Sequence, residues 1–210
     1  CAHHRYVINF GDLSEMECRR RWPELLTIVE RKVRPEREAT LRKSWSKDKE
    51  KRAKNWWQFA RTADDLYAAS TGLERVLAAG QTSKYRSLAF LPVVMVYDQK
   101  LVVFSFDSMN AFSVLHSRTH ENWALFLGST MKDDPVYTPT DCFETFPFPE
   151  GWENGPALEA AGKEYYDFRA ALMVRNNEGL TKTYNRFHDP DEESPDTLKL
   201  RELHLALIHI

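Results

Sequence analysis

Two histidines four residues apart, His116 and His120, have the most metal-like spacing in the sequence. On a helix they would share one face, as the two histidine ligands of zinc proteases do. Those enzymes also place a glutamate between the histidines, in the order H-E-x-x-H, whereas here Glu121 follows the second histidine. Since nothing else nominates a third ligand, we expect no metal site. We interpret these histidines, together with Arg118, as packing or phosphate-contacting groups.

The sequence also lacks the common catalytic signatures. It contains no G-x-G-x-x-G, no G-x-x-x-x-G-K-[ST], no G-x-S-x-G, and no Asn-Pro-Pro-aromatic run of the kind that amino-group methyltransferases use to hold the target amine. The paired carboxylates at 133–134 and 192–193 have no positioned basic or nucleophilic partner. We therefore assign no catalytic residue and expect this chain by itself to do no chemistry.

Unevenly distributed charge points instead to binding. Residues 31–54 contain eleven basic and four acidic side chains, and residues 141–193 contain five basic and twelve acidic ones, although the formal net charge of the whole sequence is only -2. Such segregation suggests a polyanion partner for the basic part. A solvated helix face with pairs such as Glu50 and Lys54 explains the same run and remains an alternative.

Aromatic residues directly after the basic run favour binding, because rings and amides then stand beside cations that neutralise phosphates. Adjacent tryptophans do not both face one core in regular backbone, so we expect one of Trp56 and Trp57 to pack and the other to reach outward. The alternative is that both anchor a core. The candidate contacts to a nucleic-acid backbone are Lys47, Lys49, Lys51, Arg52, Lys54, Trp56, Trp57, Arg61 and Arg118.

The elements expected to position these residues begin with a strand at 5–10, which is β-prone and ends at Gly11. Ser14 followed by Glu17 three residues on is a capping box, which starts a helix. Pro23 then starts a second helix. Apolar residues recur at helical spacing until Pro35, and we expect them to face the core: Leu25, Ile28, Val29 and Val33.

The middle of the chain changes to a β period. Short β-rich runs at 75–79, 87–91, 93–97 and 101–106 are broken by turn residues, and their connections are too short for helical crossovers. This predicts a small, mostly antiparallel sheet. Asp107 or Ser108 caps the next helix, which Gly128 ends; its expected buried face consists of Phe112, Leu115, Trp123 and Phe126.

The run Y-T-P-T-D-C-F-E-T-F-P-F-P at 137–149 predicts a last extended segment, since Pro147 and Pro149 remove two backbone donors and forbid helix across the junction. Its three phenylalanines, at 143, 146 and 148, are expected to be buried. A helix pattern follows at 158–174, and Gly179 is expected to supply a left-handed helix end. The fold class is thus α+β, a small mostly antiparallel sheet with packed helices followed by a helical C-terminal segment.

Several classes of protein are excluded on composition. Hydrophobic residues make up 42% of the sequence, which is enough for a core, and no apolar stretch approaches the ~18 residues of a membrane span. The opening C-A-H-H-R-Y has neither a start methionine nor a signal pattern, so we expect an excised fragment. The cysteines, Cys1, Cys18 and Cys142, suggest neither a disulfide framework nor a zinc site. The expected compartment is the cytoplasm.

Several ordered motifs together span nearly the whole chain: Gly11–Pro23, Val33–Glu38, Asn55–Phe59, Thr82–Tyr85, Leu115–Ala124, Tyr137–Trp152 and Tyr165–Pro190. The motifs up to residue 152 resemble the target-recognition region of MmeI-like DNA methyltransferases, which are single-chain restriction-modification enzymes of type IIG or IIL and related phage-defence methylases. The later Y-Y-D-F-R-A-A-L run from residue 165 is similar to the helical segment that follows that region.

This resemblance implies a target-recognition domain at 1–149 and a helical spacer at 150–210. It also implies a parent enzyme with an S-adenosylmethionine-dependent adenine methyltransferase domain upstream, and often a nuclease. The expected partners are double-stranded DNA and that upstream domain, and no membrane. No cofactor is expected in this chain itself.

Residues 84–86 fall in the linker between two expected strands, and we expect residues 129–136 to form the loop after the long helix. In the family, specificity determinants cluster in segments like these, so the resemblance assigns base readout there. Arg86 and Lys132 are suited to donate to guanine, and Asp133 or Asp134 to accept from cytosine. A protein-interaction or interdomain-docking module without base readout remains the alternative. The candidate readout residues are Lys84, Tyr85, Arg86, Ser129, Met131, Lys132, Asp133 and Val136.

Overall fold

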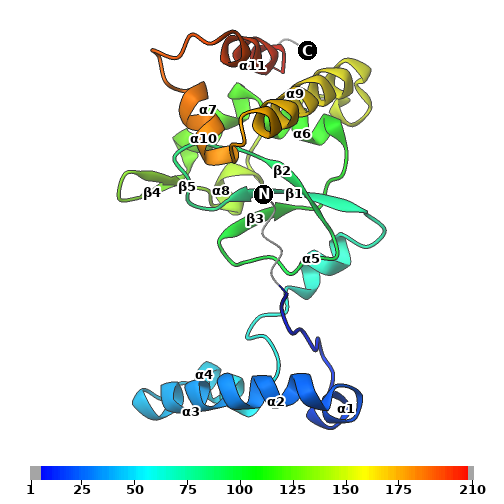
Figure 1. Ribbon diagram of the computed structural model, residues 1–210, viewed down its shortest axis with the longest axis vertical. Coiled ribbons are helices and arrows are strands. Elements are labelled where there is room, and N and C mark those ends of the chain that lie inside the picture. Colours follow the sequence, from blue (N-terminus) through cyan, green and yellow to red (C-terminus); the bar gives the residue numbers. More distant parts are fainter. Residues whose placement is uncertain (1–5, 208–210) are drawn as a thin grey trace. The chain divides into compact units, whose positions relative to one another are not determined.

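The structure is a computed structural model that describes residues 6–207. It divides into two compact units, residues 1–65 (unit 1) and residues 66–210 (unit 2), each considered by itself (Figure 1). No helix in the described range is long and apolar enough to cross a membrane.

Unit 1 is helical. Its helices are α1 (Glu15–Arg21), α2 (Pro23–Lys32), α3 (Arg34–Lys43) and α4 (Lys47–Lys54). The predicted capping box is confirmed, because the Ser14 hydroxyl accepts from the Glu17 amide and the Glu17 carboxylate accepts from the Ser14 amide. Pro23 is the first residue of α2, as predicted. A small apolar cluster joins α1 and α2 to the segments around them: Phe10, Cys18, Leu26 and Trp56.

Two expectations for unit 1 are wrong. Residues 6–10 form no strand, since Tyr6 is 99% exposed and has no neighbouring strand to pair with; Arg5 lies outside the described residues. Leu25 and Ile28 are exposed, whereas Leu26 is fully buried. Leu26 and Val29 stand three residues apart on one face of α2, and this face, not that of Leu25, meets the cluster.

Unit 2 begins with α5 (Asp64–Ala69), whose first two residues belong to unit 1, and contains a three-stranded sheet. The strands are β1 (Arg75–Gly80), β2 (Ala89–Pro92) and β3 (Leu101–Phe104), in the order β2-β1-β3, and both pairings are antiparallel. The predicted class, α+β with a small antiparallel sheet, is confirmed. The expected strand at 93–97 is absent because the chain turns after Pro92, and Val94 is 89% exposed.

The helix predicted after the sheet is two helices, α6 (Met109–His116) and α7 (Arg118–Leu127). Ser117 has extended backbone and its hydroxyl accepts from the His120 amide, which ends one helix and caps the next. Gly128 follows the last residue of α7, as predicted. The break rotates the face of α7, so Phe126, expected to be buried, is 84% exposed.

A second sheet is a hairpin of β4 (Ser129–Met131) and β5 (Asp134–Val136), which projects from the body of unit 2 (Figure 1). Residues 129–136 were expected to form a loop. Instead, the strands pair in register around a two-residue turn, Lys132 and Asp133.

The proline-aromatic run is not wholly extended, because α8 (Pro139–Cys142) lies within it and Pro139 occupies a first-turn position where a proline is tolerated. Phe146 is buried, and Phe143 and Phe148 are half-buried against the cores. Three helices follow a short 3-10 turn (Trp152–Asn154): α9 (Pro156–Arg175), α10 (Leu180–Phe187) and α11 (Pro195–Ala206). The left-handed residue between α9 and α10 is Asn177, with φ 50°, and not Gly179.

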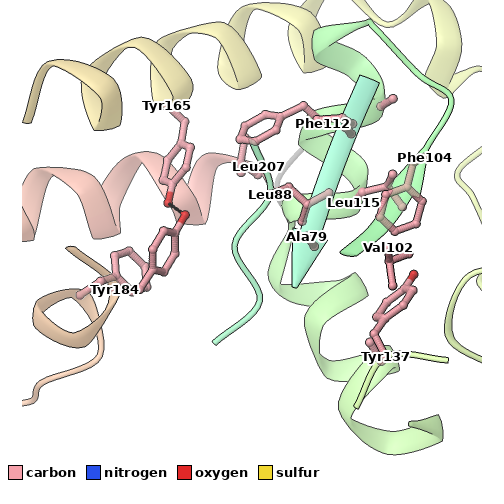
Figure 2. Close-up of a cluster of buried hydrophobic side chains, with 14 of the residues drawn as sticks. Ala79, Leu88, Val102, Phe104, Phe112, Leu115, Tyr137, Tyr165, Tyr184 and Leu207 are labelled. Atoms are coloured by element: carbon pink, nitrogen blue, oxygen red, sulfur yellow. Dashed lines mark hydrogen bonds between the residues drawn. The ribbon is translucent and has the colours of Figure 1, made fainter. Parts of the chain in front are cut away.

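The C-terminal helices share the core of unit 2. Figure 2 shows side chains of the sheet, α6, α9 and α10 meeting in one cluster. Helices α6 and α9 cross closely, because a Cβ on Gly162 would lie 2.7 Å from the Met109 carbonyl oxygen. The Ser113 hydroxyl donates to the Leu158 carbonyl across the same crossing, at 2.7 Å. The division at 149–150 remains a prediction.

Candidate functional site

Both segments assigned to base readout lie side by side in unit 2. Thr82 forms a β-bridge with Val136, and the Ser83 amide donates to the Pro135 carbonyl at 3.2 Å. The Tyr137 amide donates to the Gln81 carbonyl at 2.8 Å. Residues 81–83 thus extend the hairpin by short antiparallel contacts, which fixes the segment that follows them. We call residues 82–88 together with the 129–136 hairpin the readout surface.

A small hollow lies on this surface, and α7 contributes to its wall. The sequence interpretation missed these α7 side chains, since it treated α6 and α7 as one helix with a different buried face. The hollow is lined by Ser83, Lys84, Arg86, Glu121, Leu125 and Pro135. Cations and a carboxylate beside one apolar side chain provide donors, an acceptor and a methyl contact in one place.

Arg86 is held rather than free. Its Nη1 donates to the Gly80 carbonyl at 3.1 Å, and its guanidinium lies 4.6 Å from the centre of the Tyr137 ring. Burial lowers the pKa of Arg86. The guanidinium still carries its charge at neutral pH, because an arginine side chain loses its proton only far above that pH. A guanidinium fixed in this way keeps its remaining donors in one orientation.

The hairpin turn is exposed and strained. Lys132 has φ 57°, a left-handed conformation that side chains other than glycine rarely adopt. Lys132, Asp133 and Asp134 are all exposed, and Met131 is 60% exposed. Ser129 is also exposed, whereas Val136 is half-buried through its pairing with Thr82. The turn therefore exposes one cationic side chain, Lys132, and one anionic side chain, Asp133. Val136 instead holds the hairpin against Thr82.

Neither histidine of the metal-like pair is available to an ion. His120 is buried, with Nδ1 2.7 Å from the Leu115 carbonyl oxygen and Nε2 3.0 Å from the Tyr137 hydroxyl. One neutral tautomer satisfies both contacts, with Nδ1–H donating and Nε2 accepting. His116 lies in a separate buried network, and the described residues contain no cluster of three metal-ligating side chains. Packing is therefore the role of both histidines.

We expect the neutral state of His120 to make stability depend on pH. Burial lowers the pKa of His120 to about 4, from 6.5 in the unfolded chain, so the unfolded state binds more protons between those values. Its contribution is present above pH 6.5 and is lost as pH falls toward 4. Between pH 7 and 5, urea unfolding should show a free-energy loss about 2 kcal/mol larger for the wild type than for His120→Gln. Equal losses would contradict this account.

Unit 1 holds most of the candidate backbone contacts, on or next to α4. Lys47, Lys51 and Lys54 are exposed, Lys49 is half-exposed, and Arg61 is exposed in the segment after the helix. Arg52 pairs with Asp48 at 2.6 Å, one helical turn earlier. The helix thus carries more positive charge than its own acids neutralise. A solvated basic face is thus present, and its contact with a polyanion remains a prediction.

The two adjacent tryptophans serve the core of unit 1. Trp56 is 4% exposed, and Trp57 is half-buried with its indole N–H donating to the Leu13 carbonyl at 2.8 Å. This corrects the expectation that one of them reaches outward, because packing and a hydrogen bond hold both. Trp45, between α3 and α4, is a tryptophan whose side chain is exposed, with 65% of the residue accessible to solvent.

Arg118 starts α7 in unit 2 and is exposed. Its Nη1 pairs with the Glu121 carboxylate at 2.6 Å. Because Glu121 lines the hollow, this ion pair places Arg118 next to it. On α10, Arg186 pairs with Glu178 and Glu192, so its charge serves contacts within the C-terminal helices.

A buried polar network, which the sequence analysis missed, ties the C-terminal helices to the core. Arg169 donates to the Tyr184 hydroxyl and to the Leu88 carbonyl, both at 2.8 Å. The Tyr184 hydroxyl lies 2.8 Å from that of Tyr165 (Figure 2) and 2.6 Å from Nε2 of His116. Such a network leaves no local pattern in the sequence, because its members come from different helices.

Unit 2 thus combines a small antiparallel sheet and a projecting hairpin with a fixed arginine and exposed charges on one surface. The family model described as MmeI, target recognition domain, matches residues 2–150, and the chain belongs to this family. No curated protein shows a significant match.

Among solved structures, that of the type IIL restriction-modification enzyme MmeI in complex with DNA is similar in fold. The TM-score is 0.66 and the sequence identity 16%. The match covers 87% of this chain and 23% of that one, so the chain spans about a quarter of the length of MmeI.

Proposed function

We propose that this chain is the sequence-specific DNA-recognition module of a restriction-modification enzyme. The observation that carries the proposal is the readout surface: two segments far apart in the sequence, each assigned to base readout, are joined by the Thr82–Val136 bridge. Membership of the target-recognition family and the fold shared with MmeI, whose structure contains DNA, support it.

The proposal divides binding between the two units. In unit 1 the cations of α4, with Arg61, neutralise phosphates and supply affinity for any sequence. In unit 2 Arg86 and Lys132 donate to guanine, and Asp133 or Asp134 accepts from cytosine. A fixed donor discriminates by ~1 to 3 kcal/mol per base pair, and the contacts that hold Arg86 provide that fixity.

We further propose, from the resemblance to the family, an enzyme whose other parts lie outside this chain. A methyltransferase domain of the same polypeptide binds S-adenosylmethionine and methylates adenine in the recognised site, in the cytoplasm and in defence against phage. This chain's sequence has none of the glycine-rich or Asn-Pro-Pro-aromatic motifs that such a domain uses, so its residues do not fit the cofactor. Its own part is to choose the site.

Selection of bound sequences from randomised duplex DNA tests the division of roles. Arg86→Ala and Lys132→Ala should each change the base preferred at one or two positions, by about 5- to 100-fold, because each removes one donor to a base edge. Lys182→Ala is the matched control, since it removes an exposed charge on α10 away from the readout surface. A consensus unchanged in both readout variants would contradict the assignment of base contacts.

A docking module is the second candidate, and three exposed apolar side chains on α7 and the hairpin favour it. Leu125 is 51% exposed, Phe126 is 84% exposed and Met131 is 60% exposed. Random duplex DNA at low salt separates the two functions, because a recognition domain shows weak, salt-sensitive affinity and a docking module shows none.

A further inference from the structure

The helices after residue 150 lie outside the residues that match the family model, yet they contact the readout surface directly. The Tyr166 hydroxyl accepts from the Phe90 amide at 3.2 Å, and Arg169 donates to the Leu88 carbonyl at 2.8 Å. Both side chains come from α9, and they bind the backbone at the end of the 82–88 segment, where β2 begins. One end of the segment is therefore fixed from outside the matched region.

The middle of the segment is held by a third contact. The rings of Tyr85 and His188 stack with centroids 4.0 Å apart and planes 4° from parallel. The ammonium of Lys84 lies 4.9 Å from the centre of the same Tyr85 ring. His188 thus supports the ring on which one candidate readout cation rests.

His188 is itself held firmly enough to act as a support. It is the C-cap of α10, and its amide donates to the Tyr184 carbonyl at 3.1 Å. Its ring packs edge-on against Phe187 at 4.9 Å. Tyr184 on α10 accepts a hydrogen bond from Arg169, which also donates to the Leu88 carbonyl. The same buried network therefore holds both α10 and the end of the 82–88 segment.

We propose that His188 is a positioning residue for DNA specificity: it fixes Tyr85 and, through Tyr85, the orientation of Lys84 on the readout surface. This inference rests on the proposed function. It extends the specificity-determining part of the chain to a residue outside the family's matched region. An unsupported Tyr85 would leave the Lys84 ammonium able to sample several orientations, and a contact to a base edge discriminates only when its geometry is fixed.

The neutral form of the imidazole suits this role. Burial lowers the pKa of His188, which keeps the ring uncharged at pH 7. A charged ring would place a second cation against the tyrosine that Lys84 already contacts.

Two measurements on three variants test the proposal. His188→Ala removes the stacking ring, His188→Phe keeps a flat ring of similar size, and Asn185→Ala is an exposed control on the same helix. Amide hydrogen exchange of the free protein is measured at Ser83 and Phe90, whose hydrogen-bonded amides flank the segment, and the bound consensus is selected from randomised duplex DNA.

We expect His188→Ala to lower exchange protection at these amides by about tenfold and to weaken the base preference at the affected positions by about fivefold. His188→Phe should retain most of both, and Asn185→Ala all of both. Unchanged protection in His188→Ala would overturn the positioning role, and lost protection with an unchanged consensus would overturn its link to specificity. If the wild type selects no sequence, the proposed function fails, and hydrogen exchange still decides whether His188 positions the segment.

Discussion

Arg169→Ala should lower the free energy of unfolding by about 3 kcal/mol, since it leaves buried acceptors unpaired and a cavity behind. Arg169 is 2% exposed and has no carboxylate partner among the described residues. Its charge is instead compensated by two oxygen acceptors and by four aromatic rings, whose centroids lie 4.9 to 5.9 Å from the guanidinium carbon. Those rings come from α6, α9 and α10: Phe112, Tyr165, Tyr166 and Tyr184.

Urea unfolding of matched variants separates the parts of this effect. Arg169→Met keeps most of the side-chain volume and loses the hydrogen bonds. Its free energy of unfolding should therefore lie between that of the wild type and that of Arg169→Ala. Arg175→Ala removes an arginine from the same helix, but an exposed one paired with Asp196, and should cost less than about 1 kcal/mol. Equal stabilities of Arg169→Ala and Arg175→Ala would contradict the role assigned to the network.

Neutralising α4 should produce the largest change in DNA affinity. Replacing its four lysines by glutamine should weaken binding to every duplex by about 100- to 1,000-fold at 0.1 M salt, and reduce the slope of log K against log salt by about 3 to 4, because each released counterion contributes ~0.9 to that slope. Glutamine keeps helix propensity, so α4 itself should persist. The residues replaced are Lys47, Lys49, Lys51 and Lys54.

The matched control neutralises four lysines of unit 2 that stand outside the readout surface. It has the same formal charge change as the α4 variant, so any difference between the two reports the position of the charges and not their number. The residues are Lys100, Lys163, Lys182 and Lys199. Affinity measured across a salt series should fall far less in the control. Indistinguishable salt slopes in the two variants would show that α4 makes no special contact with phosphates.

Local signals in the sequence predicted local structure well. The Ser14–Glu17 capping box, the start of α2 at Pro23, the end of α7 at Gly128 and strand β1 are each determined by neighbours within a few residues, and all are confirmed. The antiparallel sheet followed from connection lengths. Faces of helices were less predictable, because a single capping serine at 117 rotates every later residue of α7.

Contacts between distant segments had no such signal. The resemblance to a family nominated residues 84–86 and 129–136 separately. That they lie side by side on one surface depends on the Thr82–Val136 bridge, which the sequence does not reveal. Glu121 and Leu125 join the hollow only because α7 is a separate helix. The network of Arg169 draws on α6, α9, α10 and the segment before β2, and a sequence shows each of these members only as an ordinary polar or aromatic residue.

Selection of sequences by the wild-type chain from randomised duplex DNA tests the central claim most directly. We predict that the bound fraction yields one consensus of several base pairs, and that binding weakens steeply as salt is raised, as phosphate neutralisation requires. A folded chain that retains no duplex at low salt, or that retains it without enriching any sequence, would contradict the assignment of this chain as a DNA target-recognition module.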